Sequence, residues 1–119
     1  HMTVLKNLTL APMLLKKESQ QTAEQRAMAL LDRVGLADRA GEYPARLSGG
    51  QKRRAALLRA LWAGCDTLLL DEPFTGMDPE TMKKAAALLK ERRGERAVLL
   101  ATHDREAIRE LGWKVIDLT

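Results

Sequence analysis

The 119-residue sequence is long enough for one compact domain, and its hydrophobic content of 45% excludes a disordered chain. The formal net charge of +4 favours anionic partners in general, among them nucleotides, nucleic acid and acidic membranes, without choosing between them. Charged residues interrupt the apolar runs, as Arg59 interrupts ALLRALWAG. No segment is therefore expected to span a bilayer, and any membrane role is expected to be peripheral.

The sequence holds a single cysteine, Cys65, so an internal disulfide is excluded. Together with the lack of a signal-peptide pattern, this predicts a reducing cytoplasm as the compartment. Cys65 itself is interpreted as a small buried or half-buried residue and not as a nucleophile. Residues 1–2, His-Met, resemble the remnant of a cleaved expression tag.

The first half of the chain has helical patterns. The leucine-rich segment Thr3–Lys17 contains Pro12, which predicts one or two short helices broken near the proline. A second helix is predicted over Thr22–Val34, because its first residue fits a capping box with Gln25 and Gly35 follows as a stop signal.

The stretch LSGGQKRR, from Leu47 to Arg54, opens a third predicted helix. Ser48 and Gln51 repeat the capping-box spacing before the helical pattern Lys52–Ala63. Two glycines after a helix cap expose several backbone N–H groups at the positive end of the helix, which is a ready anion site. The alternative is a capped helix preceded by a flexible turn, with no ligand.

The second half of the chain alternates between strand and helix patterns. The apolar runs TLLLD and AVLLAT predict strands buried on both faces. The order strand, helix, strand, helix, strand indicates right-handed crossovers and a parallel sheet, so this half is α/β. The five predicted elements are Thr67–Asp71, a helix from Asp78 to near Gly94, Ala97–Thr102, Asp104–Leu111 and Trp113–Leu118.

Acidic residues and a histidine follow the first two predicted strands. Because chemistry in parallel sheets gathers at the carboxyl ends of the strands, these side chains are expected at one edge of the sheet. There Asp71 could hold Mg²⁺ through water, Glu72 could orient or deprotonate an attacking water, and His103 could donate to a phosphate oxygen. The alternative is that all three are turn and capping residues.

Four motifs, in this order and spacing, resemble the nucleotide-binding subunit of an ABC transporter. They are LSGGQ (47–51), TLLLDEP (67–73), FTGMD (74–78) and ATHD (101–104). The resemblance covers almost the whole chain and extends to importers of polar amino acids. It implies a fragment of the α/β P-loop NTPase-like fold, with a helical subdomain at 3–64 and part of a RecA-like core at 65–119.

The resemblance also implies site residues and partners. In the family, two subunits sandwich two ATP molecules and drive a transmembrane transporter subunit at the cytoplasmic face of the membrane. By this resemblance, Ser48, Gly49 and Gly50 contact the γ-phosphate of a nucleotide held by the partner subunit, with Gln51 nearby. Asp71 binds Mg²⁺, Glu72 positions the attacking water and His103 contacts the γ-phosphate. Asp78 makes the contact across the dimer.

The sequence contains no G-x-x-x-x-G-K-[ST] motif, the P-loop that supplies most of the grip on phosphate. The chain alone is therefore expected to bind ATP weakly at best and not to hydrolyse it. In the family the P-loop strand lies between the strands that match Ala97–Thr102 and Trp113–Leu118. Without the P-loop strand, the sheet is expected to have a gap between these two strands. The chain is then expected either to dimerise by strand exchange or to shift its last strand into this gap.

Two other functions fit part of the sequence. One is a non-hydrolytic fragment that docks on a membrane subunit, and the other is a DNA-repair or chromosome-type ATPase of the same superfamily. The basic run Lys52, Arg53 and Arg54 is interpreted as a solvated helix face or as partners for acids. Aromatic residues make up only 3% of the chain, which argues against nucleic-acid binding by base stacking.

Overall fold

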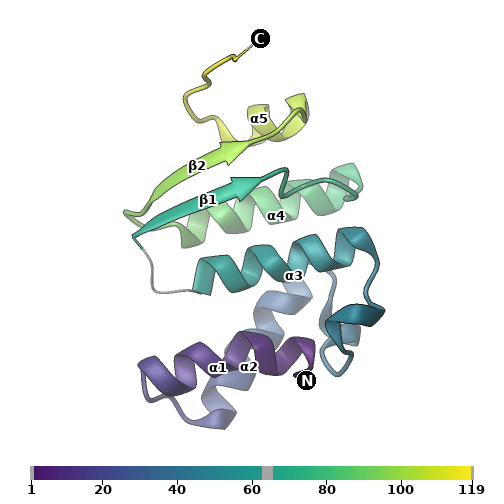
Figure 1. Ribbon diagram of the computed structural model, residues 1–119, viewed down its shortest axis with the longest axis vertical. Helices are drawn as coiled ribbons and strands as arrows, with labels where there is room; N and C mark the ends of the chain where they lie inside the picture. The colour runs from purple at the N-terminus through teal and green to yellow at the C-terminus, as the bar shows by residue number, and fades with distance from the viewer. Residues whose placement is uncertain (1, 63–65, 119) are drawn as a thin grey trace.

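The computed structural model describes residues 2–62 and 66–118. The chain runs through three helices and two short 3₁₀ turns, then alternates between strands and helices (Figure 1). Ala63, the predicted end of the third helix, and Cys65 lie outside the described residues. The elements are α1 (Val4–Leu15), α2 (Gln20–Arg33), η1 (Ala37–Arg39), η2 (Pro44–Arg46), α3 (Gly49–Trp62), β1 (Thr67–Asp71), α4 (Pro79–Arg92), β2 (Ala97–Ala101) and α5 (Arg105–Leu111).

Helix α1 is continuous, so the predicted break near Pro12 is wrong. The side chain of Pro12 is fully buried, and its carbonyl accepts hydrogen bonds from the backbone N–H groups of Lys16 (3.1 Å) and Glu18 (3.3 Å). A proline removes one helical hydrogen bond and strains the preceding turn. Packing of the buried proline outweighs that cost here, and the helix continues for about one turn beyond it.

Helix α2 begins earlier than predicted. Its N-cap is Ser19, whose hydroxyl oxygen accepts from the backbone N–H of Thr22 at 3.2 Å. Thr22 is therefore in the first turn and does not cap the helix with Gln25. At the other end, the backbone of Gly35 is left-handed (φ 73°), as expected for a residue that stops a helix.

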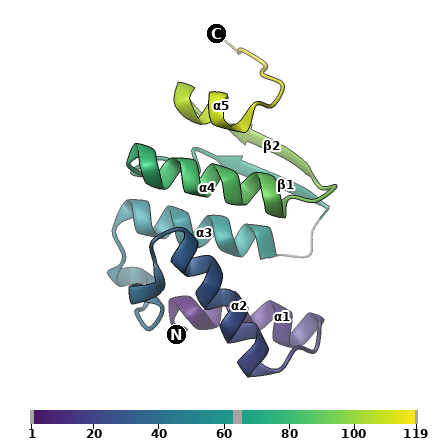
Figure 2. The same ribbon diagram turned by 180° about the vertical axis from the view of Figure 1, so that it is seen from behind.

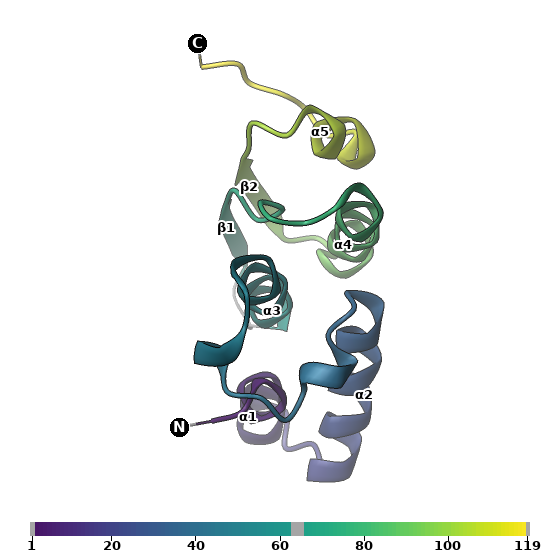
Figure 3. The same ribbon diagram turned by 90° about the vertical axis from the view of Figure 1, so that its right-hand side faces the viewer.

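The two strands form a parallel sheet in which Leu69 is paired with Leu99. Helix α4 lies against one face of this sheet, with α5 beside it, and no described element covers the opposite face (Figures 2 and 3). Leu68 on the covered face is 3% exposed, whereas Leu69 and Leu99 are 74% and 66% exposed. The prediction that both strands are buried on both faces is therefore wrong for the described residues.

The segment after α5 is not a strand, so the predicted strand at Trp113–Leu118 is also wrong. In the described residues this segment makes no ladder with β1 or β2, and it does not shift into a gap in the sheet. The side chains of Val115, Ile116 and Leu118 are exposed. The start of the segment packs against the rest of the chain, where the guanidinium of Arg93 lies 5.0 Å from the ring centre of Trp113.

One hydrophobic core joins the helical part of the chain to the sheet. Leu31 of α2, Leu57 of α3 and Met82 of α4 are all part of it, and each is almost completely buried. A bidentate ion pair adds to this join at the surface, because Arg33 of α2 donates to both carboxylate oxygens of Glu91 in α4. Within residues 2–62 and 66–118, no helix is both long and apolar enough to cross a membrane.

The uncovered face of the sheet predicts self-association of the chain. Substituting both Leu69→Lys and Leu99→Lys should convert a concentration-dependent assembly into a monomer in sedimentation velocity experiments, because charge on an apolar face opposes its burial. Folding should be retained, since both side chains already face solvent. The matched control is Leu10→Lys, on an exposed position of α1. A wild-type chain that stays monomeric at all concentrations would contradict this expectation.

Candidate functional site

The LSGGQ turn forms the predicted capping box. The hydroxyl oxygen of Ser48 accepts from the backbone N–H of Gln51 at 3.2 Å, and the side-chain oxygen of Gln51 accepts from the backbone N–H of Ser48 at 2.9 Å. Helix α3 begins at Gly49, and Ser48 and Gly49 are exposed. The turn therefore presents backbone N–H groups at a helix N-terminus that is open to solvent, the arrangement that suits an anion.

The basic residues that follow the turn are not all solvated. Lys52 and Arg53 are exposed, as expected for a surface helix face. Arg54 is half-buried, and its guanidinium donates to the backbone carbonyl of Val34 at 3.1 Å. Arg54 thus ties the N-terminal half of α3 to the end of α2, so the interpretation of the run as a solvated face holds for Lys52 and Arg53 but not for Arg54.

Glu72 is the centre of a hydrogen-bonded cluster at the carboxyl ends of β1 and β2. One carboxylate oxygen accepts from the backbone N–H of His103 at 2.9 Å, and the other accepts from the hydroxyl of Thr102 at 3.1 Å. A longer contact of 3.4 Å joins the same oxygen to the hydroxyl of Thr75. The imidazole of His103 is fully exposed, with its Nε2 3.9 Å from Glu72. The structure thus brings the predicted pair Glu72 and His103 together.

Asp71 ends β1 directly beside this cluster, and its side chain is exposed. Among the described residues, no three histidine, cysteine or acidic side chains come together to hold a metal ion. Mg²⁺ is commonly held by one or two carboxylates together with water and the phosphates of a substrate. The single exposed carboxylate of Asp71 fits that donor set, whereas a site built only from protein ligands does not fit.

Asp78 caps helix α4. Its carboxylate accepts from the backbone N–H of Thr81 at 2.7 Å. Hydrogen bonds from the hydroxyl and the backbone of Thr81, with the positive charges of Arg54 and Lys84, hold the pKa of Asp78 below its usual range. Pro79 and Glu80 occupy the first turn of α4, as the sequence predicted.

Two residues of the site were not singled out from the sequence. Thr102 donates its hydroxyl to Glu72 and accepts from the backbone N–H of Asp104 at 3.0 Å, so it links Glu72 to the start of α5. Gly76 lies against the backbone of Gly50 in the LSGGQ turn. The pattern Thr-x-Asp before a helix predicts the hydrogen bond between Thr102 and Asp104. No local pattern reveals the contact between Gly76 and Gly50.

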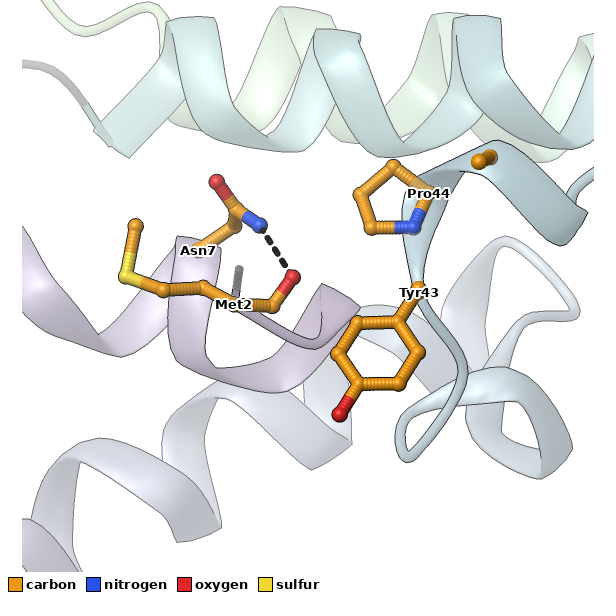
Figure 4. A pocket seen from close by; sticks show the side chains of 5 residues that line it. Met2, Asn7, Tyr43 and Pro44 are labelled. Carbon is orange, nitrogen blue, oxygen red and sulfur yellow. Dashed lines mark hydrogen bonds between the residues drawn. The ribbon is translucent and has the colours of Figure 1, made fainter.

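A separate open pocket of about 610 Å³ lies between the start of α1 and η2. Figure 4 shows Met2, Asn7, Tyr43 and Pro44 around it, with the side-chain amide of Asn7 donating to the backbone carbonyl of Met2 at 3.2 Å. None of its lining residues belongs to the LSGGQ turn or the Glu72 cluster.

The lowered pKa of Asp78 predicts a pH-dependent contribution to stability. A carboxyl whose pKa is lower in the folded state stabilises the fold fully above its unfolded value of about 3.9, and this effect is lost as the pH falls through the folded value. Asp78→Asn keeps a good helix cap without the charge. Urea midpoints of the wild type and Asp78→Asn should therefore differ at pH 7, and the difference should shrink as the pH falls below the unfolded value. Asp32→Asn, on the exposed face of α2, is the control, and an equal pH dependence in both variants would contradict the expectation.

A family model described as ABC transporter matches residues 1–75. Among curated proteins, the chain is 42% identical over 118 residues to the probable ABC transporter ATP-binding protein PEB1C of Campylobacter jejuni subsp. jejuni serotype O:23/36 (strain 81-176). It is 41% identical over 117 residues to the arginine transport ATP-binding protein ArtM of Bacillus subtilis (strain 168). Each match covers 98% of this chain and 49% of the relative, so the chain spans about half the length of the curated relatives it matches.

Among solved structures, the chain resembles the dimeric ATP-binding cassette MJ0796 in a post-hydrolysis state bound to ADP and Pi. The TM-score is 0.74 at 33% sequence identity, over 92% of this chain and 49% of that one. The fold is therefore that of part of a P-loop NTPase-like ABC ATPase, with helices and a small parallel sheet. The family model matches more than half of the residues of this chain, and the chain therefore belongs to the ABC transporter family.

Proposed function

We propose that the chain is part of the ATP-binding and ATP-hydrolysing subunit that powers an ABC transporter. The observation that carries the proposal is the cluster around Glu72, a carboxylate oriented by Thr102 and by the backbone of His103 at the end of a parallel sheet. Membership of the family and the resemblance to a cassette bound to ADP and Pi support the same function.

In this proposal the LSGGQ turn contacts the γ-phosphate of a nucleotide held by a second subunit. Gly49 and Gly50 supply backbone N–H groups at the positive end of α3. The backbone N–H of Ser48 is bonded to Gln51 in the capping box, so Ser48 contributes its hydroxyl as the donor, and Gln51 fixes the turn. The exposure of Ser48 and Gly49 supports this role, because the turn must be reachable from outside the subunit. The dimer described for MJ0796 supports a second ATPase subunit as the partner.

Glu72 and His103 are proposed as the catalytic residues. Both carboxylate oxygens of Glu72 accept hydrogen bonds from neighbouring groups, which fix the plane of the carboxylate and leave further lone pairs for a water molecule. A carboxylate held in this way can orient the attacking water and accept its proton. The exposed imidazole of His103 is free to donate to a phosphate oxygen on the solvent side of the cluster.

ATP and Mg²⁺ are the proposed cofactors, and when bound ATP supplies the phosphoryl group that is transferred to water. Asp71 is the proposed Mg²⁺ residue, acting through water, since its carboxylate is exposed next to Glu72. Asp78 is the proposed contact across the subunit interface. Its role as the cap of α4 fixes it at the exposed end of the loop that follows Glu72.

We further infer that the complete subunit works at the cytoplasmic face of the membrane, bound to a transmembrane subunit. The relatives are named as ATP-binding proteins of transporters, and ArtM is named for arginine transport. A polar amino acid is therefore the proposed cargo.

Titration calorimetry tests the division of the nucleotide site. The 119-residue chain should give no saturable heat with Mg-ATP up to about 1 mM, because its sequence lacks the P-loop motif that supplies most of the phosphate contacts. Saturable binding in the micromolar range would mean that the LSGGQ turn forms a phosphate site within a single chain, and would contradict the proposed sharing between subunits.

The role of Glu72 is tested in the complete subunit that contains this sequence. Glu72→Gln should lower the rate of ATP hydrolysis by about 100-fold to 10,000-fold, because the amide cannot accept a proton, while ATP binding is retained. Glu106→Gln removes an exposed carboxylate of α5 as the control and should leave hydrolysis unchanged. Hydrolysis at the wild-type rate in Glu72→Gln would exclude Glu72 as the base.

A further inference from the structure

The two glycines of the LSGGQ turn have different surroundings. A Cβ atom added to Gly50 would lie 2.5 Å from the carbonyl oxygen of Gly76 and 3.1 Å from its carbonyl carbon. A Cβ atom added to Gly49 would meet only the guanidinium of Arg53, at 3.6 Å, which is an ordinary contact with the end of a flexible side chain. Only Gly50 therefore has no room for a side chain.

The contact is equally close from the side of Gly76. A Cβ atom added there would lie 3.1 Å from the Cα atom and 3.3 Å from the nitrogen of Gly50. Gly76 also has a left-handed backbone (φ 82°), which other residues adopt only with strain. Two backbones thus touch directly, although the residues are far apart in sequence.

Neither partner in this contact can move away easily. Gly76 belongs to the loop between β1 and α4, in which Phe74 is 2% exposed and its carbonyl accepts from the backbone N–H of Met77 at 3.2 Å. Asp78 fixes the end of the same loop as the cap of α4. Gly50 is in the first turn of α3, which the capping box holds in place.

We propose that Gly76 is a positioning residue for the LSGGQ turn. Its contact with Gly50 sets where the N-terminus of α3 lies relative to the loop that carries Glu72 and Asp78. Gly50 is a glycine because of this packing within the chain, whereas Gly49 keeps the open face that a ligand can approach. The proposal rests on the proposed function only in naming a nucleotide as that ligand.

The first test compares two substitutions in the same helical turn of the 119-residue chain. In a helix, Gly→Ala normally favours folding, so Gly49→Ala should raise the folding equilibrium constant by about threefold. Gly50→Ala should instead lower it by about tenfold, because the new methyl group overlaps the backbone of Gly76. Equal gains in stability for the two variants would overturn the proposal.

A second pair separates the contact from the cost of a left-handed backbone. Gly94 has a similar conformation (φ 62°), and an added Cβ atom would meet nothing within 4 Å. Gly76→Ala and Gly94→Ala both place alanine in a left-handed conformation, but only Gly76→Ala adds a contact with the LSGGQ turn. This pair tests the contact between Gly76 and Gly50 even if Gly50→Ala fails to fold. Equal losses of folding stability in Gly76→Ala and Gly94→Ala would overturn the proposal.

Positioning is distinguished from general stabilisation by local hydrogen exchange in the folded chain. The backbone N–H of Gln51, which is bonded to Ser48, should exchange about tenfold faster in Gly76→Ala relative to the most protected core amides. Gly94→Ala should leave this ratio unchanged. A merely structural role would accelerate all amides together, and that result would overturn the proposal whatever the outcome of nucleotide binding.

Discussion

The hydrogen bonds between Glu72 and the end of β2 are the interaction on which the candidate site depends. Glu72 has a left-handed backbone (φ 46°), a conformation that costs a residue other than glycine about 1–3 kcal/mol. Its N–H donates to the carbonyl of Ala101 at 2.8 Å, which extends the pairing of the two strands by one residue. The strained turn aims the carboxylate at Thr102 and His103, and so joins the two strand ends into one site.

Features that depend on local spacing could be predicted from the sequence. The capping box of Ser48 and Gln51, the cap at Asp78 and the pairing of two parallel strands follow from residues three or four apart or from a change of period. The spacing predicts a start of α2 at Thr22 instead of Ser19, because both residues are good caps and spacing alone does not choose between them. The left-handed backbone of Glu72 has no local signal, since it follows from the pairing with Ala101.

The two wrong predictions about the sheet, on the burial of its strands and on a third strand, have a common physical cause. Runs such as TLLLD place leucines on both faces of a strand, a pattern typical of parallel sheets covered by helices on both sides. Whether a face is covered depends on segments far away in sequence, and in the described residues α4 covers only one face. Leu69 and Leu99 are thus exposed, and Trp113–Leu118, apolar enough for a strand, is not paired with β1 or β2.

The LSGGQ turn shows how one short motif can satisfy two constraints at once. Its capping box is purely local and would form in any chain with this spacing. The requirement for glycine at position 50 comes instead from Gly76, which is reached only after the chain has passed through α3 and β1. A short glycine motif therefore predicts a site that an anion can approach, but the three-dimensional contacts decide which of its glycines has no room for a side chain.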